Sequence, residues 1–368
     1  MKAAHPAVTP PVLLVATQLA PWAAQWDELV GLSPLPSPFL RSWWLTGTGG
    51  RRRRFLLVVR DDELLGGLAL DEGRRLGLPC LRMMGSGPLC PDHLDLLARP
   101  GHEDAVVGAV RAWLGRPGSR LLDLEGIRPG SRLLGALPGR VRREPSGVAP
   151  WARLSITGDA YLAARPPGFR RNLRKATARL VAAGAAHRIS RGQSAVRSLE
   201  TLRRLHAAQW EGRSRFLPSF DRFVAACRLA AETDEVAVHE LHVGETVIAI
   251  MVSFEVMGRV SLYQSARLND ARWRDAGAVL LAASISDACD RGFSEVDFLR
   301  GDEPYKRNFA PERRELLRLR TANAWAGQAG MLAETAARRA KVTALRWADS
   351  RHRRAAVLGR PRQVRGHA

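Results

Sequence analysis

The feature that most constrains the fold is an order of segments that occurs twice along the chain, over 55–126 and over 236–301. Each occurrence has two apolar runs around a short polar turn, then a helical pattern, then an apolar run that ends in glycine, Gly126 or Gly301. Apolar runs that flank a polar turn predict a β-hairpin. A recurring order of this kind indicates an internal duplication. The parts are 55–60, 64–70, 103–114 and 120–126, and then 236–241, 246–256, 278–291 and 294–301.

We therefore predict an α/β (α+β) chain in which each unit is a mixed, mainly antiparallel sheet flanked by helices. The 368 residues leave room for about two domains. We expect an N-terminal domain over 1–150, a C-terminal domain over 151–320, and a basic helical or disordered tail over 321–368. The run VLLVATQLA lies between prolines and contains Gln18, so we expect a first strand there and not a signal peptide.

The charge is strongly positive, at +21 from 57 basic and 36 acidic residues. Only four of the 57 are lysines, and so uneven a choice of arginine, beside abundant Ala and Gly, indicates codon usage in a GC-rich genome. That weakens the usual inference from basic charge to a nucleic-acid partner without abolishing it. The tail can be a solvated basic helix or a contact for RNA or anionic lipid.

Cysteine usage and hydropathy indicate a cytoplasmic protein. The four cysteines show no CxxC or Cys/His spacing, so we expect reduced thiols, no disulfide framework and no metal. No apolar run approaches the roughly 18 residues of a membrane helix, so no transmembrane segment is expected. GxSxG, HExxH and Walker motifs are also missing, which favours chemistry without a metal or a dedicated nucleophile.

The stretch 296–309, VDFLRGDEPYKRNF, concentrates reactive groups. A strand-like run that contains Asp297 breaks at Gly301, and an acid pair, a phenol and an amine follow: Asp302, Glu303, Tyr305 and Lys306. Loops at strand ends are where rigid scaffolds display reactive groups. The stretch is either a functional site or a solvated strand–loop junction, because crowded charges mark sites only statistically.

A second candidate is an anion site at the start of the helix 278–291. RWRDAGAVLL (272–281) brings together two arginines, a glycine and a helix N-terminus, whose free N–H groups suit a pyrophosphate. Asp275 is at the expected N-cap, where its carboxylate satisfies the same N–H groups and repels phosphate. An ordinary capped helix is the alternative.

A further candidate is the basic face of FRRNLRK (169–175), which includes Arg170 and Arg171. This face either binds an anion or is a solvated helix face.

The second half resembles the CelD type of GNAT-superfamily acyltransferases, which belong to bacterial cellulose and exopolysaccharide synthesis. The resemblance lies in FRRNLRKATARL, HAAQWEGR, RLNDARWRDAGAVLL and, most specifically, GFSEVDFLRGDEPYKRNFA. It covers about 150–320 well and 20–150 more weakly. It implies two GNAT-like units in one chain, the first of them degenerate, similar in plan to Fem-type aminoacyltransferases.

The resemblance also implies acetyl-CoA or another acyl-CoA as donor, with its pyrophosphate held at Arg272, Arg274, Ala276, Gly277 and Ala278. Relatives have a small residue and proline before this glycine, where this chain has Asp275-Ala276. An acid there demands that the two arginines offset it. We expect the acceptor, an unidentified amine or hydroxyl, to contact Arg170, Arg171, Trp210, Tyr263 and Asp297.

In a GNAT-like mechanism the acceptor attacks the thioester directly. Asp302 or Glu303 is the expected base, since a partly buried carboxylate can be tuned upward toward neutrality. Tyr305 is the expected donor to the departing thiolate, with Tyr263 as the rival phenol. Lys306 is expected to orient an anionic acceptor or to hold Asp302.

Two other functions stay open. One is a Fem-type aminoacyltransferase that uses aminoacyl-tRNA on a peptidoglycan precursor, which suits the positive charge but is disfavoured by FLRGDEPYK. The other is a non-catalytic protein that binds an anionic polymer on a GNAT scaffold, for which Asp275 is the best argument.

Overall fold

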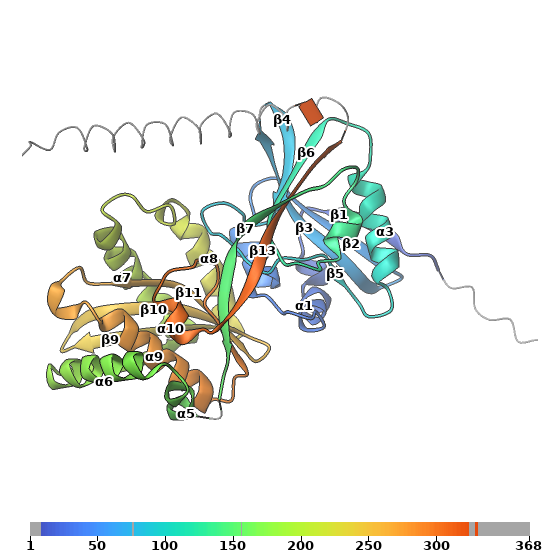
Figure 1. Cartoon of the computed structure of the whole chain (residues 1–368). Helices are drawn as coiled ribbons and strands as arrows, with labels where there is room; N and C mark the ends of the chain where they lie inside the picture. The colour runs from blue at the N-terminus through green and yellow to red at the C-terminus, as the bar shows by residue number, and fades with distance from the viewer. Residues whose placement is uncertain (1–8, 76, 156, 324–327, 330–368) are drawn as a thin grey trace, which may run out of the picture.

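The computed structural model describes residues 9–75, 77–155, 157–323 and 328–329. We call β1 to β7 the N-terminal half and α5 to β13 the C-terminal half (Figure 1). The N-terminal half consists of β1 (Val12–Ala16), α1 (Ala23–Gly31), α2 (Ser42–Thr48), β2 (Arg53–Arg60), β3 (Glu63–Arg75), β4 (Leu78–Met83), β5 (Leu97–Ala98), α3 (Glu103–Leu114), β6 (Arg120–Ile127), α4 (Leu133–Ala136) and β7 (Arg142–Arg153).

The C-terminal half repeats this order after two helices of its own. It consists of α5 (Gly158–Ala163), α6 (Pro167–Ala182), β8 (Ala185–Arg191), α7 (Gly192–Trp210), α8 (Phe220–Glu232), β9 (Val236–Val243), β10 (Thr246–Val256), β11 (Arg259–Arg267), α9 (Ala276–Asp290), β12 (Glu295–Asp297), α10 (Lys306–Phe309) and β13 (Glu312–Asn323). From β8 onward each element has a counterpart in the N-terminal half, in the same order. The structure thus confirms the predicted repetition and the mixed α/β fold class.

The two halves share one sheet because they exchange their last strands. Among the described residues the sheet has 13 strands, in the order β1-β2-β3-β4-β6-β13-β7-β12-β11-β10-β9-β8, with β5 paired to β3. β13 pairs with β6 of the N-terminal half, and β7 pairs with β12 of the C-terminal half. Both strands run between the two lobes of the molecule in Figure 1.

This exchange bears on the expected domain division. β7 spans the predicted boundary between residues 150 and 151, and β13 extends into the predicted tail as far as Asn323. Apart from 321–323 and 328–329, the tail lies outside the described residues. The expected strand near the N-terminus is present as β1.

Helices cover both faces of the C-terminal part of the sheet. α6 and α9 pack on one face, where Leu173 and Leu180 join Leu280 and Ile285 in an apolar core. α7 and α8 pack on the other face, in a core that continues into the N-terminal half. β10 is buried along almost its whole length, as expected for a strand that is covered on both faces.

The closest helix packing between the halves is at Gly47. A Cβ atom at this position would lie 2.4 Å from the backbone of Ala226, which joins α2 of the N-terminal half to α8 of the C-terminal half. Only glycine permits so close an approach. The two halves are therefore joined by helix packing as well as by strand exchange.

Candidate functional site

The two parallel strands around α9 separate soon after they meet. β11 pairs with β12 only through Arg259–Ser261 against Glu295–Asp297, and β11 then continues to Arg267. The chain passes through a short 3-10 helix, Ala271–Trp273, before α9 begins. The end of β11 and the start of α9 therefore lie together at the edge where the strands part.

The start of α9 differs from the expected capped helix. The Asp275 side chain makes no capping hydrogen bond to α9. Its Oδ2 atom instead accepts from Arg179 Nη2 of α6 at 2.8 Å, so the acid is balanced by an arginine that the sequence did not single out. The expectation that this carboxylate satisfies the helix N–H groups was wrong. The reason is that a neighbouring helix offers it a charged partner.

The predicted coenzyme residues surround this helix start. Arg272 and Arg274 have side chains that are 76% and 71% exposed, and Arg272 is held by Asp270 at 2.7 Å. Ala276 is buried, and Ala278 donates its N–H to the Asp275 carbonyl. A Cβ atom at Gly277 would meet only Arg267 Cδ, at 3.8 Å. These residues fit an anionic group, since a helix start and exposed guanidinium groups both attract one, although Asp270 and Asp275 lie against the two arginines.

The acid pair of the 296–309 stretch lies at the surface. Asp302 pairs with Arg307 at 2.9 Å and with Arg313 at 3.1 Å, and Arg307 is the main cause of a lowered pKa of its carboxyl. The upward tuning that we expected for Asp302 is therefore wrong. Glu303 is half exposed and lies 2.9 Å from Lys306 Nζ.

Tyr305 and Lys306 follow as an exposed phenol and a buried amine. Desolvation and the charge of Glu303 raise the pKa of Tyr305 to about 12, so its hydroxyl keeps its proton at neutral pH. Lys306 Nζ lies 3.3–3.5 Å from the carbonyl oxygens of Leu299, Arg300 and Gly301. The amine thus ties the loop together and pairs with Glu303, and the expectation that it holds Asp302 was wrong.

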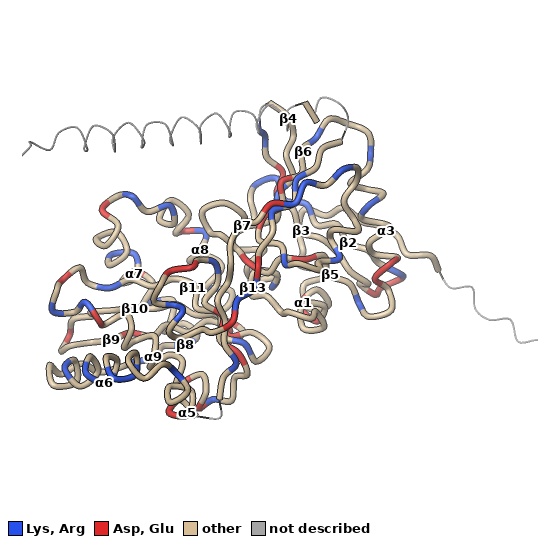
Figure 2. The backbone as a smooth tube through the Cα atoms, viewed as in Figure 1, with Lys and Arg blue, Asp and Glu red and all other residues tan. Residues whose placement is uncertain are grey.

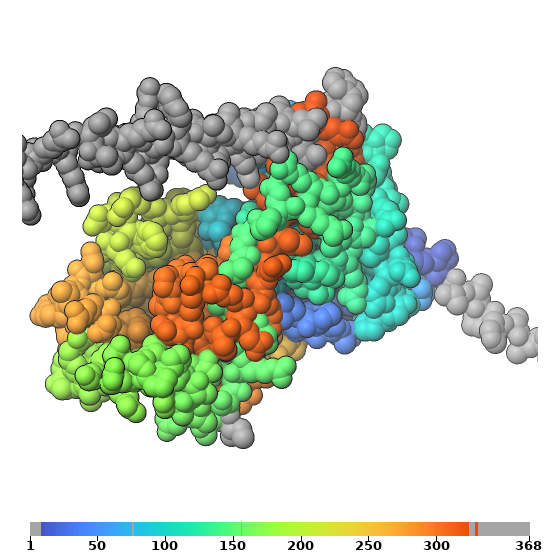
Figure 3. All heavy atoms as spheres, in the orientation of Figure 1, coloured from blue at the N-terminus to red at the C-terminus, as the bar shows by residue number. Residues whose placement is uncertain are grey.

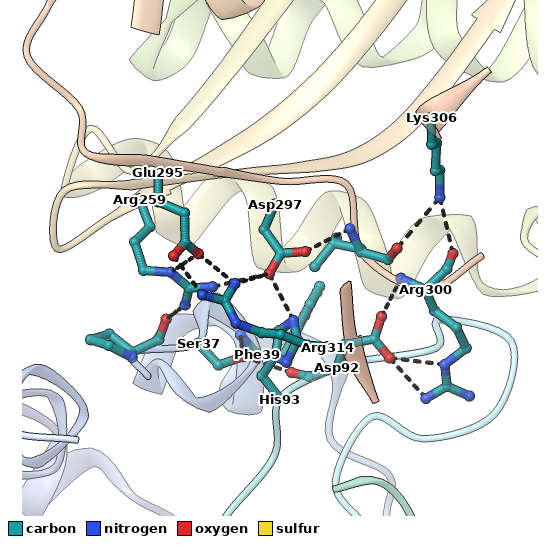
Figure 4. Close-up of polar contacts among 12 residues, drawn as sticks. Ser37, Phe39, Asp92, His93, Arg259, Glu295, Asp297, Arg300, Lys306 and Arg314 are labelled. Carbon is teal, nitrogen blue, oxygen red and sulfur yellow. Dashed lines mark hydrogen bonds and ion pairs between the residues drawn. The ribbon is translucent and has the colours of Figure 1, made fainter. Parts of the chain in front are cut away.

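Asp297 is fully buried in an ion cluster between the halves (Figure 4). Its Oδ2 atom lies 2.8 Å from His93 Nε2, 3.0 Å from Arg259 and 3.3 Å from Arg314. Burial opposes ionisation, but His93 and Arg259 hold the pKa of Asp297 well below its usual range. The structure gives this carboxylate protein partners at both oxygens, because Oδ1 accepts from the Leu299 N–H. It does not place Asp297 where an acceptor could reach it.

A second buried carboxylate, which belongs to the N-terminal half, holds the loop that follows β12. Asp92 is buried; its Oδ2 accepts the Arg300 N–H at 2.6 Å and its Oδ1 accepts from Arg300 Nε at 2.9 Å (Figure 4). Burial raises the pKa of Asp92, although Arg300 acts against this rise. Sequence reasoning missed Asp92 and His93, because no motif marks them and their partners Arg300 and Asp297 lie far away along the chain.

The remaining predicted acceptor residues lie on opposite faces of the sheet. Arg170 and Arg171 belong to α6, on the α9 face of the sheet, and Figure 2 shows several basic positions along this helix. Tyr263 lies on the other face and donates its hydroxyl to the Leu89 carbonyl at 2.7 Å. Burial raises the pKa of Tyr263 well above its usual value. Trp210, at the end of α7, is 47% exposed. The structure therefore does not bring these residues together at one site.

One group of side chains has the composition of a metal site. The ligand atoms of His239, Glu255 and Asp287 lie within 4.8 Å of one another. Arg291 Nη1 is 2.7 Å from both oxygens of Glu255, and Arg191 pairs with Asp287 at 2.8 Å. Arginines thus already balance these carboxylates, and we assign no metal to them.

Comparisons with known proteins agree with this fold. Residues 167–307 match the family model of the acetyltransferase (GNAT) domain. FemX has a similar structure, with a TM-score of 0.57 and 10% identity over 80% of this chain and 95% of that chain. The C-terminal domain of a protein assigned as a lysylphosphatidylglycerol synthetase from Agrobacterium fabrum has a TM-score of 0.55 and 12% identity over 86% and 95%.

L-PGS from Bacillus licheniformis is similar to the same degree, with a TM-score of 0.55 and 11% identity over 83% of this chain and 93% of that chain. No curated protein matches the sequence. Within the described residues, no helix combines the length and the apolar character that crossing a membrane requires. These findings support the GNAT superfamily and its acyltransferase fold, while the CelD type remains a prediction.

Proposed function

We propose that the protein transfers an acetyl or other acyl group from acyl-CoA to an amine or hydroxyl. The observation that carries this proposal is the start of α9, where Arg272 and Arg274 are exposed and Arg179 balances Asp275. An anion site needs accessible donors and positive charge, and the exposed guanidinium groups at this helix start supply both. The match of residues 167–307 to the GNAT domain supports the same assignment.

In this proposal the coenzyme supplies the thioester, and residues of the chain position the coenzyme and protonate the departing thiolate. The N–H groups at the start of α9, with Arg272 and Arg274, hold the pyrophosphate. Tyr305 keeps its proton at neutral pH and is the proposed donor to the departing thiolate; its raised pKa makes it a weaker acid than an unperturbed phenol. Of the two acids, Glu303 is the better base, since the arginines around Asp302 stabilise its charged form and weaken it as a proton acceptor.

The acceptor belongs to the proposal and not to the findings. The CelD-type resemblance favours a saccharide or another small molecule and a role in exopolysaccharide synthesis. It also favours N- or O-acylation in the cytoplasm by direct attack. Arg170 and Arg171 on α6 are then candidates for coenzyme phosphate or anionic acceptor contacts.

A second candidate is transfer of an aminoacyl group from tRNA. The observation that favours it is the structural likeness to a protein assigned as a lysylphosphatidylglycerol synthetase, together with the exposed basic residues of α6. The acid at Asp275 was the best argument for a non-catalytic scaffold. Because Arg179 offsets the charge of this acid, that function is now less favoured.

Calorimetry with acetyl-CoA, a longer acyl-CoA and tRNA separates these functions. We expect acyl-CoA to bind, and Arg274→Ala to weaken it by about tenfold, the effect of losing one charge-assisted hydrogen bond. Arg140→Ala, which removes an exposed arginine of the N-terminal half, is the matched control and should leave affinity unchanged. Tight tRNA binding without coenzyme binding would favour the aminoacyl transfer.

A further inference from the structure

His206 is a buried imidazole near the end of α7 that the proposed roles above do not use. Its side chain is 5% exposed, and its Nδ1 atom has no hydrogen-bond partner within the described residues. A buried polar atom without a partner costs about 1–3 kcal/mol. Such groups are rare in native proteins, and a functional role is one of the few explanations for them.

The imidazole is covered by aromatic rings and not by the deep core. Trp210 stacks on it with ring centroids 5.9 Å apart and planes at 24°, and Phe216 lies 5.3 Å away. Trp210 is about half exposed, whereas Phe216 is buried, so one of the two rings over the imidazole borders solvent. Access of a ligand to His206 requires the Trp210 ring to turn aside.

The end of α7 lies over the part of β11 that extends beyond β12. Gln209 Oε1 accepts the Arg267 N–H at 3.0 Å, which fixes α7 to the last residue of β11. Phe216 lies 6.3 Å from Tyr263, whose hydroxyl reaches Leu89 of the N-terminal half. Figure 3 shows the surface hollowed where yellow-green atoms of the α7–α8 region approach blue-green atoms of the N-terminal half.

We propose that His206, and not Glu303, is the catalytic residue that accepts the proton of the attacking acceptor. The inference rests on the proposed acyl transfer. The nitrogen or oxygen of the acceptor forms a bond to the acyl carbon while its proton passes to His206 Nδ1. The carbon–sulfur bond breaks, the sulfur keeps the electron pair, and the thiolate takes the proton of the Tyr305 hydroxyl, which solvent then replaces. The imidazolium then returns its proton to solvent.

The charge state of the imidazole suits this role. Burial lowers the pKa of His206, so the ring is neutral and able to accept a proton at neutral pH. Two of the charged groups near His206 along the chain are engaged elsewhere: Arg213 pairs with Glu211 at 3.7 Å, and Arg203 stacks over Phe220 at 5.6 Å. Both acids of the loop after β12 are paired with cations, Asp302 with Arg307 and Arg313 and Glu303 with Lys306, whereas the Nδ1 atom of His206 has no partner within the described residues.

The test is the cleavage of acetyl-CoA in buffer, with water as the acceptor and the products separated by chromatography. We expect His206→Gln to lower kcat about 100-fold, a typical contribution of one general base. Acetyl-CoA affinity should not change. The loss of activity of the wild type at acid pH should disappear in the variant. A kcat within about threefold of the wild type would overturn the proposal.

His242→Gln is the matched control. His242 is also buried with an unpartnered Nδ1, but it lies on β9 and its Nε2 is 3.2 Å from Glu240. This variant should keep full activity. Equal losses in both variants, or a comparable fall in melting temperature, would mean that His206 acts only in packing, and would overturn the proposal.

A second readout separates this proposal from the proposed function. Diethyl pyrocarbonate modifies accessible neutral imidazoles, and mass spectrometry locates the adducts. We expect His206 to react faster than His242, and faster again in Trp210→Ala. If the wild type cleaves no acetyl-CoA, the proposed donor is wrong, while selective reaction at His206 still supports a proton-accepting site. If His206 is as inert as His242, the proposal fails.

Discussion

The two halves have the same arrangement of elements but place opposite charges at the start of the helix between the parting strands. In the C-terminal half β11 and β12 part, and the helix between them starts beside exposed Arg272 and Arg274. In the N-terminal half β4 and β6 also pair through only two residues each, but α3 starts with Glu103 and Asp104. Acids in the first turn satisfy a helix start and repel another anion.

The N-terminal half also fills the space that its strands leave. The segment between β4 and α3 folds back, so that Leu89, Leu94 and Leu97 are buried, and Leu94 bridges to Ile127. The same segment carries Asp92 and His93 across to the loop of the C-terminal half. We infer from this comparison that the N-terminal half holds the loop of the C-terminal half in place, while the C-terminal half carries the proposed site. The predictions below test this division.

The largest effect is expected at the buried cluster between the halves. Asp297→Ala removes the carboxylate that His93, Arg259 and Arg314 share. Breaking a buried ion pair from one side leaves uncompensated charge and costs about 3–5 kcal/mol. Urea unfolding measures this loss. A cost below about 1 kcal/mol would show that the cluster does not hold the halves together.

The Asp297 carboxylate should also make the free energy of unfolding depend on pH in the acid range. The pKa of Asp297 is lower in the folded chain than in the unfolded one, so its stabilisation is complete above the unfolded value of about 4. As pH falls below that value, the unfolded state binds a proton first and the stabilisation is lost. We expect a fall in the free energy of unfolding below about pH 4 that is smaller in Asp297→Asn. Equal acid dependence in both proteins would contradict the assignment.

A smaller effect is expected where the helices of the halves meet. Gly47→Ala puts a methyl group against the Ala226 backbone, and overpacking of this kind costs about 1–3 kcal/mol. Gly108→Ala, in α3 of the N-terminal half, adds a methyl group to open space and should stabilise by up to about 1 kcal/mol. Thermal unfolding compares the pair. Similar shifts in both would mean that the contact at Gly47 is not tight.

The smallest effect concerns the acids at the two helix starts. Asp275→Asn removes a negative charge beside the proposed pyrophosphate site and should tighten acetyl-CoA binding about two- to fivefold, since a charge at a helix end is worth about 0.3–1 kcal/mol. Asp104→Asn, at the start of α3, should leave the affinity unchanged. Calorimetry measures both. Tighter acetyl-CoA binding by the Asp104→Asn variant would mean that the coenzyme binds to the N-terminal half, and would contradict the proposal.

Local patterns allowed much of the fold to be predicted. Alternating apolar runs around polar turns gave both hairpins, and their recurrence gave the repeat, because these signals depend on neighbouring residues. The strand exchange could not be predicted in this way. β7 and β13 each pair across the halves, and no local pattern tells a strand which partner it takes.

The coenzyme site at the start of α9 stays a prediction. The grouping of its arginines was visible because Arg272 and Arg274 are only two positions apart in the sequence. The partners of Asp275, Asp297 and Arg300 come from residues far away along the chain: Arg179, His93 and Asp92. Lys306 looked reactive because the sequence does not show that loop carbonyl groups surround its amine.

Hydrogen exchange with and without acetyl-CoA tests the division between the halves most directly. The account predicts that acetyl-CoA slows amide exchange at residues 272–281, around the start of α9, and leaves exchange at residues 99–108, around the start of α3, unchanged. Slower exchange at the start of α3, or at neither helix, would contradict the claim that the C-terminal half alone holds the coenzyme.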